Sequence, residues 1–179
     1  MNNDVCYVAV DPGKNGGIAA IFNSVVVLTE VMPVQDKYYL PGDIVKIFEN
    51  LQGTYGTVIV TVEDVHSLFT VSAKSNFQFG FGAGLVEGVC TGMKLPFVKV
   101  HPKKWQEYAW QGIHPILIDT GKLTPQGGKK YKTDTKATSL IAAQRLFPQV
   151  DMTKSARAKK AHEGIVDALL IAYYASKTR

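Results

Sequence analysis

The feature that most constrains this chain is a set of short, continuous apolar runs, each of which meets an acidic residue. Residues 5–10 lead into Asp11, residues 58–62 lead into Glu63, and a third apolar run spans residues 165–172. The acids at these runs are Asp11, Glu63, Glu163 and Asp167. A carboxylate at the tip of a buried strand is costly to desolvate unless a positive group meets it. The pattern therefore predicts one shared positive partner, for which a divalent metal ion is the simplest candidate.

The spacing of apolar residues, turns and helix caps predicts an α/β fold, with a mixed five-stranded sheet flanked by helices. Three strands joined by tight turns come first, and a helix, a strand, a long helix, a strand and further helices follow. The expected strands are residues 5–10, 17–22, 25–31, 58–62 and 96–100, and the expected helices begin near residues 41, 72, 101, 134 and 159. A chain of 179 residues with 46% hydrophobic residues is expected to form a single domain, residues 1–179.

Residues 111–134 differ from the rest of the chain in composition. They are rich in Gly, Pro, Thr and Lys and show little periodicity, so we expect a long, mobile, basic loop. Asp134 is a plausible N-cap for the helix that follows, and Pro148 is expected to stop that helix.

Positive charge gathers beside the predicted acids. The chain has 20 Lys and Arg against 15 Asp and Glu, which gives a formal net charge of +5. The clustered basic residues are Lys103, Lys104, Lys129, Lys130, Lys132, Lys154, Arg157, Lys159 and Lys160. This placement is compatible with a polyanionic partner such as a phosphate backbone, although each cluster is equally compatible with a solvated protein face.

The remaining composition argues for a soluble, cytoplasmic protein with no membrane partner. No segment reaches membrane-spanning length, and the N-terminus lacks a basic stretch followed by an apolar one. Cys6 and Cys90 both lie within apolar stretches, which is typical of buried thiols in a reducing compartment. No Cys/His spacing suggests a zinc site.

Taken in order, these motifs resemble the ribonuclease H-like superfamily and, more narrowly, the RuvC-type Holliday junction resolvases. The matching segments are Val8-Ala9-Val10-Asp11-Pro12-Gly13, Val62-Glu63-Asp64-Val65, the glycine-rich stretch from Gly80 to Gly88, and Asp167-Ala168-Leu169-Leu170-Ile171-Ala172. The resemblance covers nearly the whole chain. It implies a ribonuclease H-like fold and a metal-dependent endodeoxyribonuclease, which acts on crossover junctions in DNA recombination and repair in a bacterial cell or a phage-infected host.

The chain departs from this family at the last pair of acids. Many bacterial members place these carboxylates three residues apart, where this chain has Gly164, and the preceding acid is Glu163, four residues before Asp167. Both spacings keep the two side chains on one helical face. The wider spacing of this chain resembles that of the mitochondrial branch of the family. The stretch from His162 to Asp167 is more similar to bacteriophage-encoded members.

The resemblance, together with hard-cation chemistry, implies a two-metal mechanism. Asp11, Glu63, Glu163 and Asp167 are expected to be catalytic and to hold two Mg²⁺ or Mn²⁺ ions about 3.5–4 Å apart, with Asp11 bridging them. One ion would activate a water for in-line attack, and the other would stabilise the leaving 3′ oxygen. Opposed strands would be nicked to leave 5′-phosphate and 3′-hydroxyl ends. His162 is an auxiliary catalytic candidate, or a solvated residue beside the lysines.

Several residues are candidates for DNA contact. Phe69 could stack on an unpaired base, and Lys103 and Lys104 are placed by the resemblance near the scissile phosphate. The full set of DNA-binding candidates is His66, Phe69, Lys103, Lys104, Lys129, Lys130, Lys132, Lys159 and Lys160.

Glycines recur through the long helix between residues 77 and 92, where each is intrinsically destabilising. They indicate close helix packing, either against the protein's own sheet or in a homodimer that would set two active sites on opposed strands. Two other functions remain open: a nuclease of the same superfamily acting on other branched DNA or on RNA–DNA hybrid, and a junction-binding protein without cleavage activity. An actin-like ATPase is disfavoured, because that fold needs two such domains.

Overall fold

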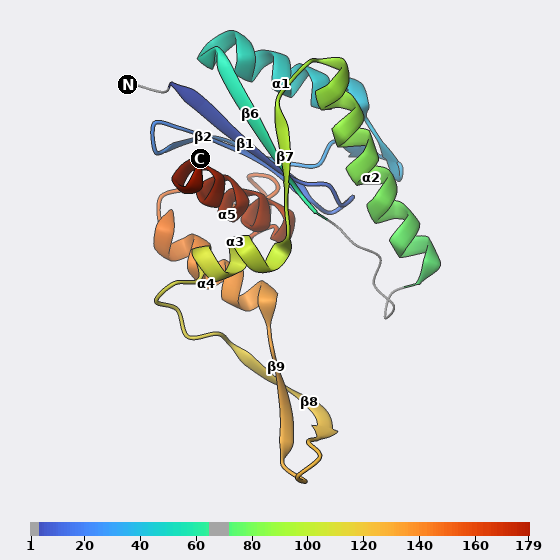
Figure 1. The fold of residues 1–179 in the computed structure, drawn as a ribbon, viewed down its shortest axis with the longest axis vertical. Coiled ribbons are helices and arrows are strands. Elements are labelled where there is room, and N and C mark those ends of the chain that lie inside the picture. Colours follow the sequence, from blue (N-terminus) through green and yellow to red (C-terminus); the bar gives the residue numbers. More distant parts are fainter. Residues whose placement is uncertain (1–3, 65–71) are drawn as a thin grey trace.

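The computed structural model describes residues 4–64 and 72–179, and a mixed five-stranded sheet lies at its centre (Figure 1). The strands of this sheet, in spatial order, are β3 (Val25–Val31), β2 (Gly17–Phe22), β1 (Val5–Asp11), β6 (Thr57–Glu63) and β7 (Phe97–Val100). β1, β2 and β3 pair antiparallel, whereas β6 runs parallel to both β1 and β7. The mixed five-stranded sheet expected from the apolar runs is confirmed.

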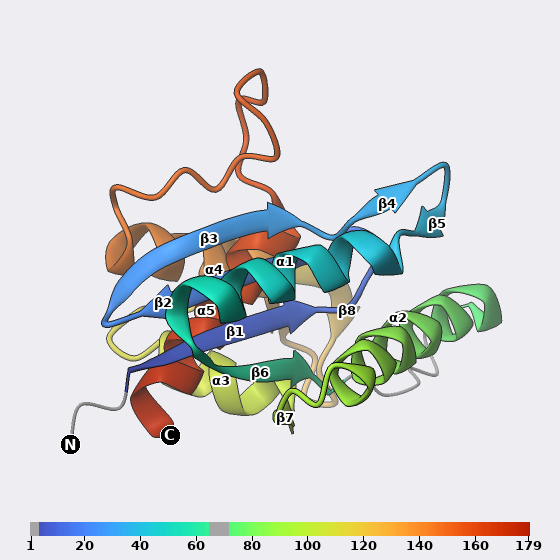
Figure 2. The same ribbon diagram turned by 90° about the horizontal axis from the view of Figure 1, so that it is seen from above.

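Helices cover both faces of the sheet (Figure 2). They are α1 (Pro41–Tyr55), α2 (Ala73–Gly92), α3 (Pro102–Ala109), α4 (Thr135–Leu146) and α5 (Glu163–Thr178). Successive side chains of a strand point to opposite faces. Val8 and Val10 of β1 therefore pack in one core with residues of α1 and α2, while Ala9 packs in a second core with α3, α4 and α5. Because both faces of β1 are buried, the strand is a continuous apolar run, and its only charged residue is the last one, Asp11.

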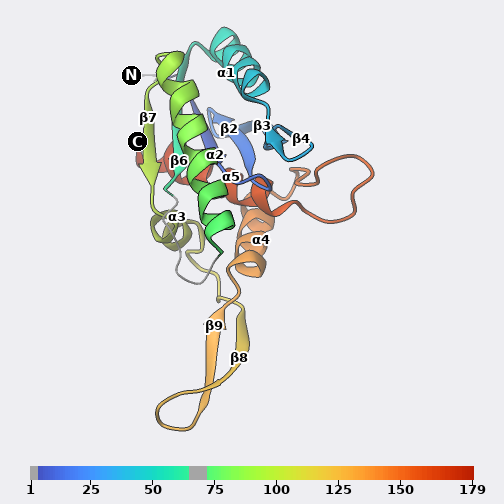
Figure 3. The same cartoon turned by 90° about the vertical axis from the view of Figure 1, so that its right-hand side faces the viewer.

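The long loop expected over residues 111–134 is largely a β-hairpin. β8 (Leu117–Leu123) pairs antiparallel with β9 (Lys129–Thr133), and the hairpin projects away from the sheet and its helices (Figures 1 and 3). The Thr120 hydroxyl donates to the Lys130 carbonyl at 2.7 Å, and the turn contains Gly127 at a φ of 82°. Apolar alternation is absent because the strands cover no core. A second small hairpin, β4 (Val34–Gln35) with β5 (Tyr38–Tyr39), was not expected from the sequence.

The last helix begins later than predicted. The sequence suggested a start near residue 159, but α5 begins at Glu163, with His162 in the N-cap position. Residues 159–162 are held outside the helix because Thr153 bridges Ala161 and the His162 N–H donates to the Met152 carbonyl at 2.7 Å. Lys159 and Lys160 therefore lie on an irregular segment next to the helix and not on its surface.

Both cysteines are buried and form no disulfide, as their apolar surroundings predicted. Burial raises the pKa of Cys6 and of Cys90 to about 11, so both thiols stay protonated at neutral pH. In the described ranges, every helix is too short or too polar to cross a bilayer.

Candidate active site

Two of the predicted acids meet at one edge of the sheet because β1 and β6 are parallel neighbours. The register pairs Val10 with Val62, so the next residues, Asp11 and Glu63, end their strands side by side. The two carboxylates are close enough for the charge of Asp11 to raise the pKa of Glu63. The sheet itself therefore brings together acids that are 52 positions apart in the chain.

The other two acids reach this edge through a contact between glycines. The first turn of α5 lies against the turn between β1 and β2, and a Cβ on Gly164 would stand only 2.2 Å from the carbonyl carbon of Gly16. No residue larger than glycine fits there without a shift of the backbone. The contact places Asp167 within the electric field of Asp11. It also explains the departure at this position: an acid at residue 164 has no room, so the earlier acid of the pair is Glu163.

In the resulting cluster of Asp11, Glu63 and Asp167, the negatively charged form of each carboxyl group is disfavoured. Burial raises the pKa of Asp11, and the N–H of Gly13, which donates to its carboxylate at 3.2 Å, opposes the rise. Burial and then the charge of Asp11 raise the pKa of Glu63 to about 7. Burial, followed by the charges of Asp11 and Glu63, raises the pKa of Asp167 to about 8. Carboxyl groups that repel each other in this way are characteristic of sites that take up a cation.

Two residues that the sequence did not single out lie beside these acids. The indole Nε1 of Trp105, in α3, donates to Oε1 of Glu63 at 2.9 Å, and the Trp105 side chain is only 1% exposed. The buried hydroxyl of Ser139, in α4, lies near Asp167 and opposes the rise of its pKa. From sequence, Trp105 could be recognised only as an aromatic residue on a short helix.

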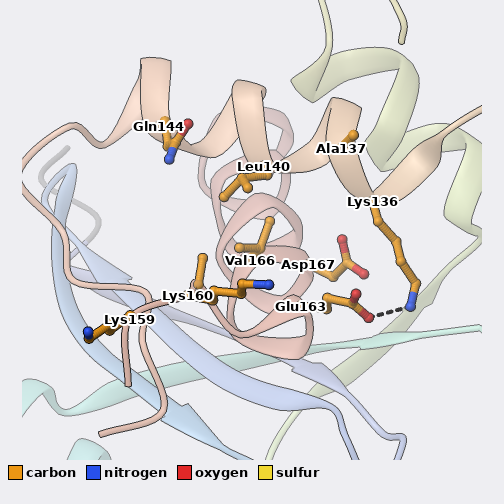
Figure 4. A pocket seen from close by; sticks show the side chains of 10 residues that line it. Lys136, Ala137, Leu140, Gln144, Lys159, Lys160, Glu163, Val166 and Asp167 are labelled. Atoms are coloured by element: carbon orange, nitrogen blue, oxygen red, sulfur yellow. Dashed lines mark hydrogen bonds and ion pairs between the residues drawn. The ribbon is translucent and has the colours of Figure 1, made fainter. Parts of the chain in front are cut away.

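Glu163 differs from the other three acids because it already has a cationic partner. The Lys136 ammonium, from the first turn of α4, forms an ion pair with Glu163 at the mouth of the site (Figure 4). The Glu163 side chain is 60% exposed. Nothing in the sequence distinguished Lys136 from a solvated lysine, because its neighbour Glu163 is 27 positions away.

The donor chemistry at this edge fits a hard divalent cation. All four groups are carboxylates, which are the ligands preferred by Mg²⁺ and Mn²⁺. The three half-buried ones, Asp11, Glu63 and Asp167, carry raised pKa values that a cation would reverse. Within residues 4–64 and 72–179, no group of three or more His, Cys, Asp or Glu side chains stands as a ready ligand cluster.

His162 lies at the edge of this site, at the N-cap of α5. Its Nδ1 atom is buried and has no hydrogen-bond partner in the described part of the chain. Burial and then the charge of Lys154 lower its pKa, while Glu163 opposes that change. These effects favour the neutral form of the ring, and its auxiliary catalytic role stays a prediction.

The predicted basic residues fall into groups that differ in their distance from the acids. Lys159 and Lys160 line a cleft together with Glu163 and Asp167 (Figure 4). Lys103 and Lys104 are exposed in the first turn of α3, the helix whose Trp105 touches Glu63.

The other lysines lie on the hairpin that projects from the body (Figure 3). There Lys129 forms an ion pair with Asp119 at 3.3 Å, while Lys130 and Lys132 are exposed. His66 and Phe69 lie outside the described residues, so their predicted DNA contacts stay predictions.

Comparisons with known proteins address the fold. No family model matches the chain, and none of the curated proteins matches its sequence. The structure of RuvC from Thermus thermophilus in complex with a Holliday junction substrate has a TM-score of 0.60 at 13% identity, covering 96% of this chain and 92% of that one. A second T. thermophilus RuvC structure has a TM-score of 0.54 at 15% identity, covering 96% and 95%. The chain therefore has the ribonuclease H-like fold of the RuvC Holliday junction resolvases, as its motifs predicted.

Proposed function

We propose that this protein is a structure-selective endonuclease that resolves four-way DNA junctions. The observation that carries the proposal is the convergence of Asp11, Glu63 and Asp167 from β1, β6 and α5, each with a raised pKa. The fold shared with RuvC supports the same conclusion, since one solved RuvC structure is a complex with a Holliday junction substrate.

In the proposed reaction, the half-buried carboxylates of Asp11, Glu63 and Asp167 would hold two Mg²⁺ or Mn²⁺ ions together with Glu163. When bound, the ions would supply an activated water and stabilise the negative charge on the leaving 3′ oxygen. The protein's own part is to hold the carboxylates. Trp105 fixes one oxygen of Glu63, and the backbone N–H of Gly13 orients Asp11. Lys136 pairs with Glu163, and when an ion binds this carboxylate the Lys136 ammonium could turn to a phosphate of the substrate.

The lysines around the site support binding of a phosphate backbone. Lys159 and Lys160 line a cleft with Glu163 and Asp167, and Lys103 and Lys104 lie in the first turn of α3, whose Trp105 contacts Glu63. Lysines bind phosphate as point charges and give little sequence discrimination. This arrangement suits a substrate recognised by its branched shape.

A homodimer would supply the second active site that symmetric cleavage requires. Phe77, Phe81, Gly84 and Gly88 lie on one stripe of α2, and the Phe81 ring also contacts Tyr39 of β5, with 5.8 Å between the ring centroids. Phe77 is 68% exposed and Phe81 is 50% exposed. A Cβ at Gly84 or Gly88 would meet nothing within 4 Å. Exposed aromatic rings beside open glycines favour a second copy of this helix as the partner.

The direct test is incubation with an end-labelled four-way junction in Mg²⁺ or Mn²⁺. A linear duplex, a three-way junction and an RNA–DNA hybrid of the same sequence serve as competitors. Symmetric nicks in the four-way junction alone would support the proposal. Preferred cutting of the hybrid would make the protein a ribonuclease of this fold. Tight junction binding without any cutting would identify a non-cleaving junction binder.

A further inference from the structure

A cleft extends from the acid cluster along the groove between α4 and α5 (Figure 4). Its volume is about 440 Å³. One end is formed by Glu163 and Asp167, and the other end is formed by Gln144. We call this feature the α4–α5 cleft.

The cleft is lined by one face of each helix. Ala137, Leu140 and Gln144 recur at the spacing of one face of α4, and Val166 of α5 lies opposite them. The wall between the two ends is therefore aliphatic. Lys160, on the irregular segment before α5, borders the same space (Figure 4). The chain thus surrounds an apolar slot with positive charge at its rim, and a catalytic carboxylate closes one end.

This chemistry selects a ligand with an apolar body and an attached negative charge. A volume of this size falls in the range of roughly 300–1,000 Å³ that is typical of sites for single small molecules. The body would lie between Leu140 and Val166, while Lys159 and Lys160 would face the negative group. At the end away from the acids, the exposed amide of Gln144 can both donate and accept a hydrogen bond, as the edge of a nucleobase requires. A single nucleotide has all three properties.

We propose that the α4–α5 cleft receives one nucleobase of the strand to be cut, unstacked from the junction, with its phosphate against Lys159 and Lys160. The inference rests on the proposed function and adds a source of sequence preference to it. Extruding a base from a regular duplex costs a few kcal/mol, and the cost is least where pairing or stacking is already interrupted, as it is at a branch point. The cleft adjoins Asp167, so capture of the base would set the neighbouring phosphate at the acids.

The experiment uses 2-aminopurine, whose fluorescence rises when it leaves a base stack. Junctions carry the probe at one position at a time on either side of the cut phosphate, which is first mapped with the wild-type protein in Mg²⁺. Binding is then followed in Ca²⁺. The wild type is compared with Leu140→Trp, which fills the cleft. The matched control is Ile141→Trp, the same substitution at the next residue, whose side chain is exposed and lies outside the cleft.

We expect the wild type to raise the emission at one position by at least about twofold. This rise should disappear in Leu140→Trp and persist in Ile141→Trp. Gln144→Ala, at an exposed residue that does not threaten folding, should keep the rise but weaken the preference for one base at that position by about tenfold.

The proposal is overturned if no probe position responds while the wild type binds and cuts the junction. It is also overturned if Leu140→Trp and Ile141→Trp behave alike. A loss of binding on replacement of Lys159 and Lys160, with no effect of Leu140→Trp or Gln144→Ala, would mean that the cleft holds phosphate only and no base. Failure of the wild type to bind or cut any junction would instead reject the proposed function itself, and this inference with it.

Discussion

The acidic edge of the central sheet and the basic β8–β9 hairpin carry charge of opposite sign. The edge is built on the two cores, whereas the hairpin covers no core. At the edge, Asp11, Glu63 and Asp167 are held by strands and a helix that form the two cores, and their charges repel. On the hairpin, the charged residues are exposed, and the only carboxylate among them, Asp119, already pairs with Lys129. At the edge of the sheet, the carboxylates repel each other, and a bound cation would reduce this repulsion. On the hairpin, the exposed lysines are available to bind a polyanion.

This difference predicts that chemistry and binding can be separated by mutation. Asp11→Asn should lower the cleavage rate by roughly 10³-fold or more, because it removes a charged ligand of the metal ions. Junction affinity measured in Ca²⁺ or EDTA should survive. Asp119→Asn, the same substitution on the hairpin, is the matched control and should leave cleavage near normal. Substantial Mg²⁺-dependent cutting by Asp11→Asn would reject the metal site.

The fourth acid gives a smaller effect, because it is more exposed than the others. Glu163→Gln should lower cleavage by roughly 10²-fold, since residues 163 and 167 share a helical face. His162→Ala should lower it far less, because His162 lies in the N-cap and outside that face. Cleavage rates of both variants across pH and metal concentration check the assignment. The opposite ranking of the two variants would make the histidine the working group.

The glycine contact between α5 and the β1–β2 turn can be tested through stability. Gly164→Ala places a Cβ 2.2 Å from the backbone of Gly16 and should lower the free energy of unfolding by about 1–3 kcal/mol. Gly84→Ala, in the exposed stripe of α2, meets nothing and should raise it by up to about 1 kcal/mol. Urea titration of both variants measures the difference. Equal effects would show that the close approach does not constrain α5.

The repulsion among the acids should make stability fall as pH rises. The pKa of Asp167 is raised from its ordinary value of 3.8 to about 8, and that of Glu63 from 4.5 to about 7. The folded protein therefore keeps protons that the unfolded chain releases, so the free energy of unfolding declines between about pH 4 and pH 8. Mg²⁺ should restore the melting temperature at pH 8 and have little effect at pH 5. Asp167→Asn should flatten both responses, and an unchanged profile would contradict the raised pKa values.

The same contrast explains what could be predicted from the sequence. The ends of β1 and β6 could be predicted because a strand buried on both faces is a continuous apolar run in the sequence. Neighbouring parallel strands also end at the same edge of the sheet. The hairpin could not be predicted, because Leu117–Leu123 covers no core and its sequence does not alternate apolar and polar residues. Lys136 and Trp105 were missed for another reason: each acts on an acid at least 27 positions away, through contacts that only the folded chain creates. The late start of α5 depends on a bridge from Thr153 to Ala161, which is equally nonlocal.

The smallest expected effect concerns the two faces of the hairpin. Lys130 and Lys132 alternate with Lys129 along β9, so they share one face while Lys129 lies on the other. In the part of the chain that the structure describes, only Lys129 of these three has an acidic partner. Replacing Lys130 and Lys132 together by Ala should therefore reduce the slope of log affinity against log salt by about 1.8, because each neutralised phosphate contributes about 0.9.

The matched control removes the ion pair as a unit. Lys129→Ala combined with Asp119→Asn leaves the net charge of the hairpin unchanged, and it should change the slope little. With saturating junction, both variants should cleave at the wild-type rate, because the hairpin projects away from the sheet and its helices (Figure 1). A slope that falls equally in both variants would mean that Lys129 leaves Asp119 to contact the DNA. A slope unchanged in both would make the hairpin a bystander and confine the phosphate contacts to the lysines beside the acid cluster.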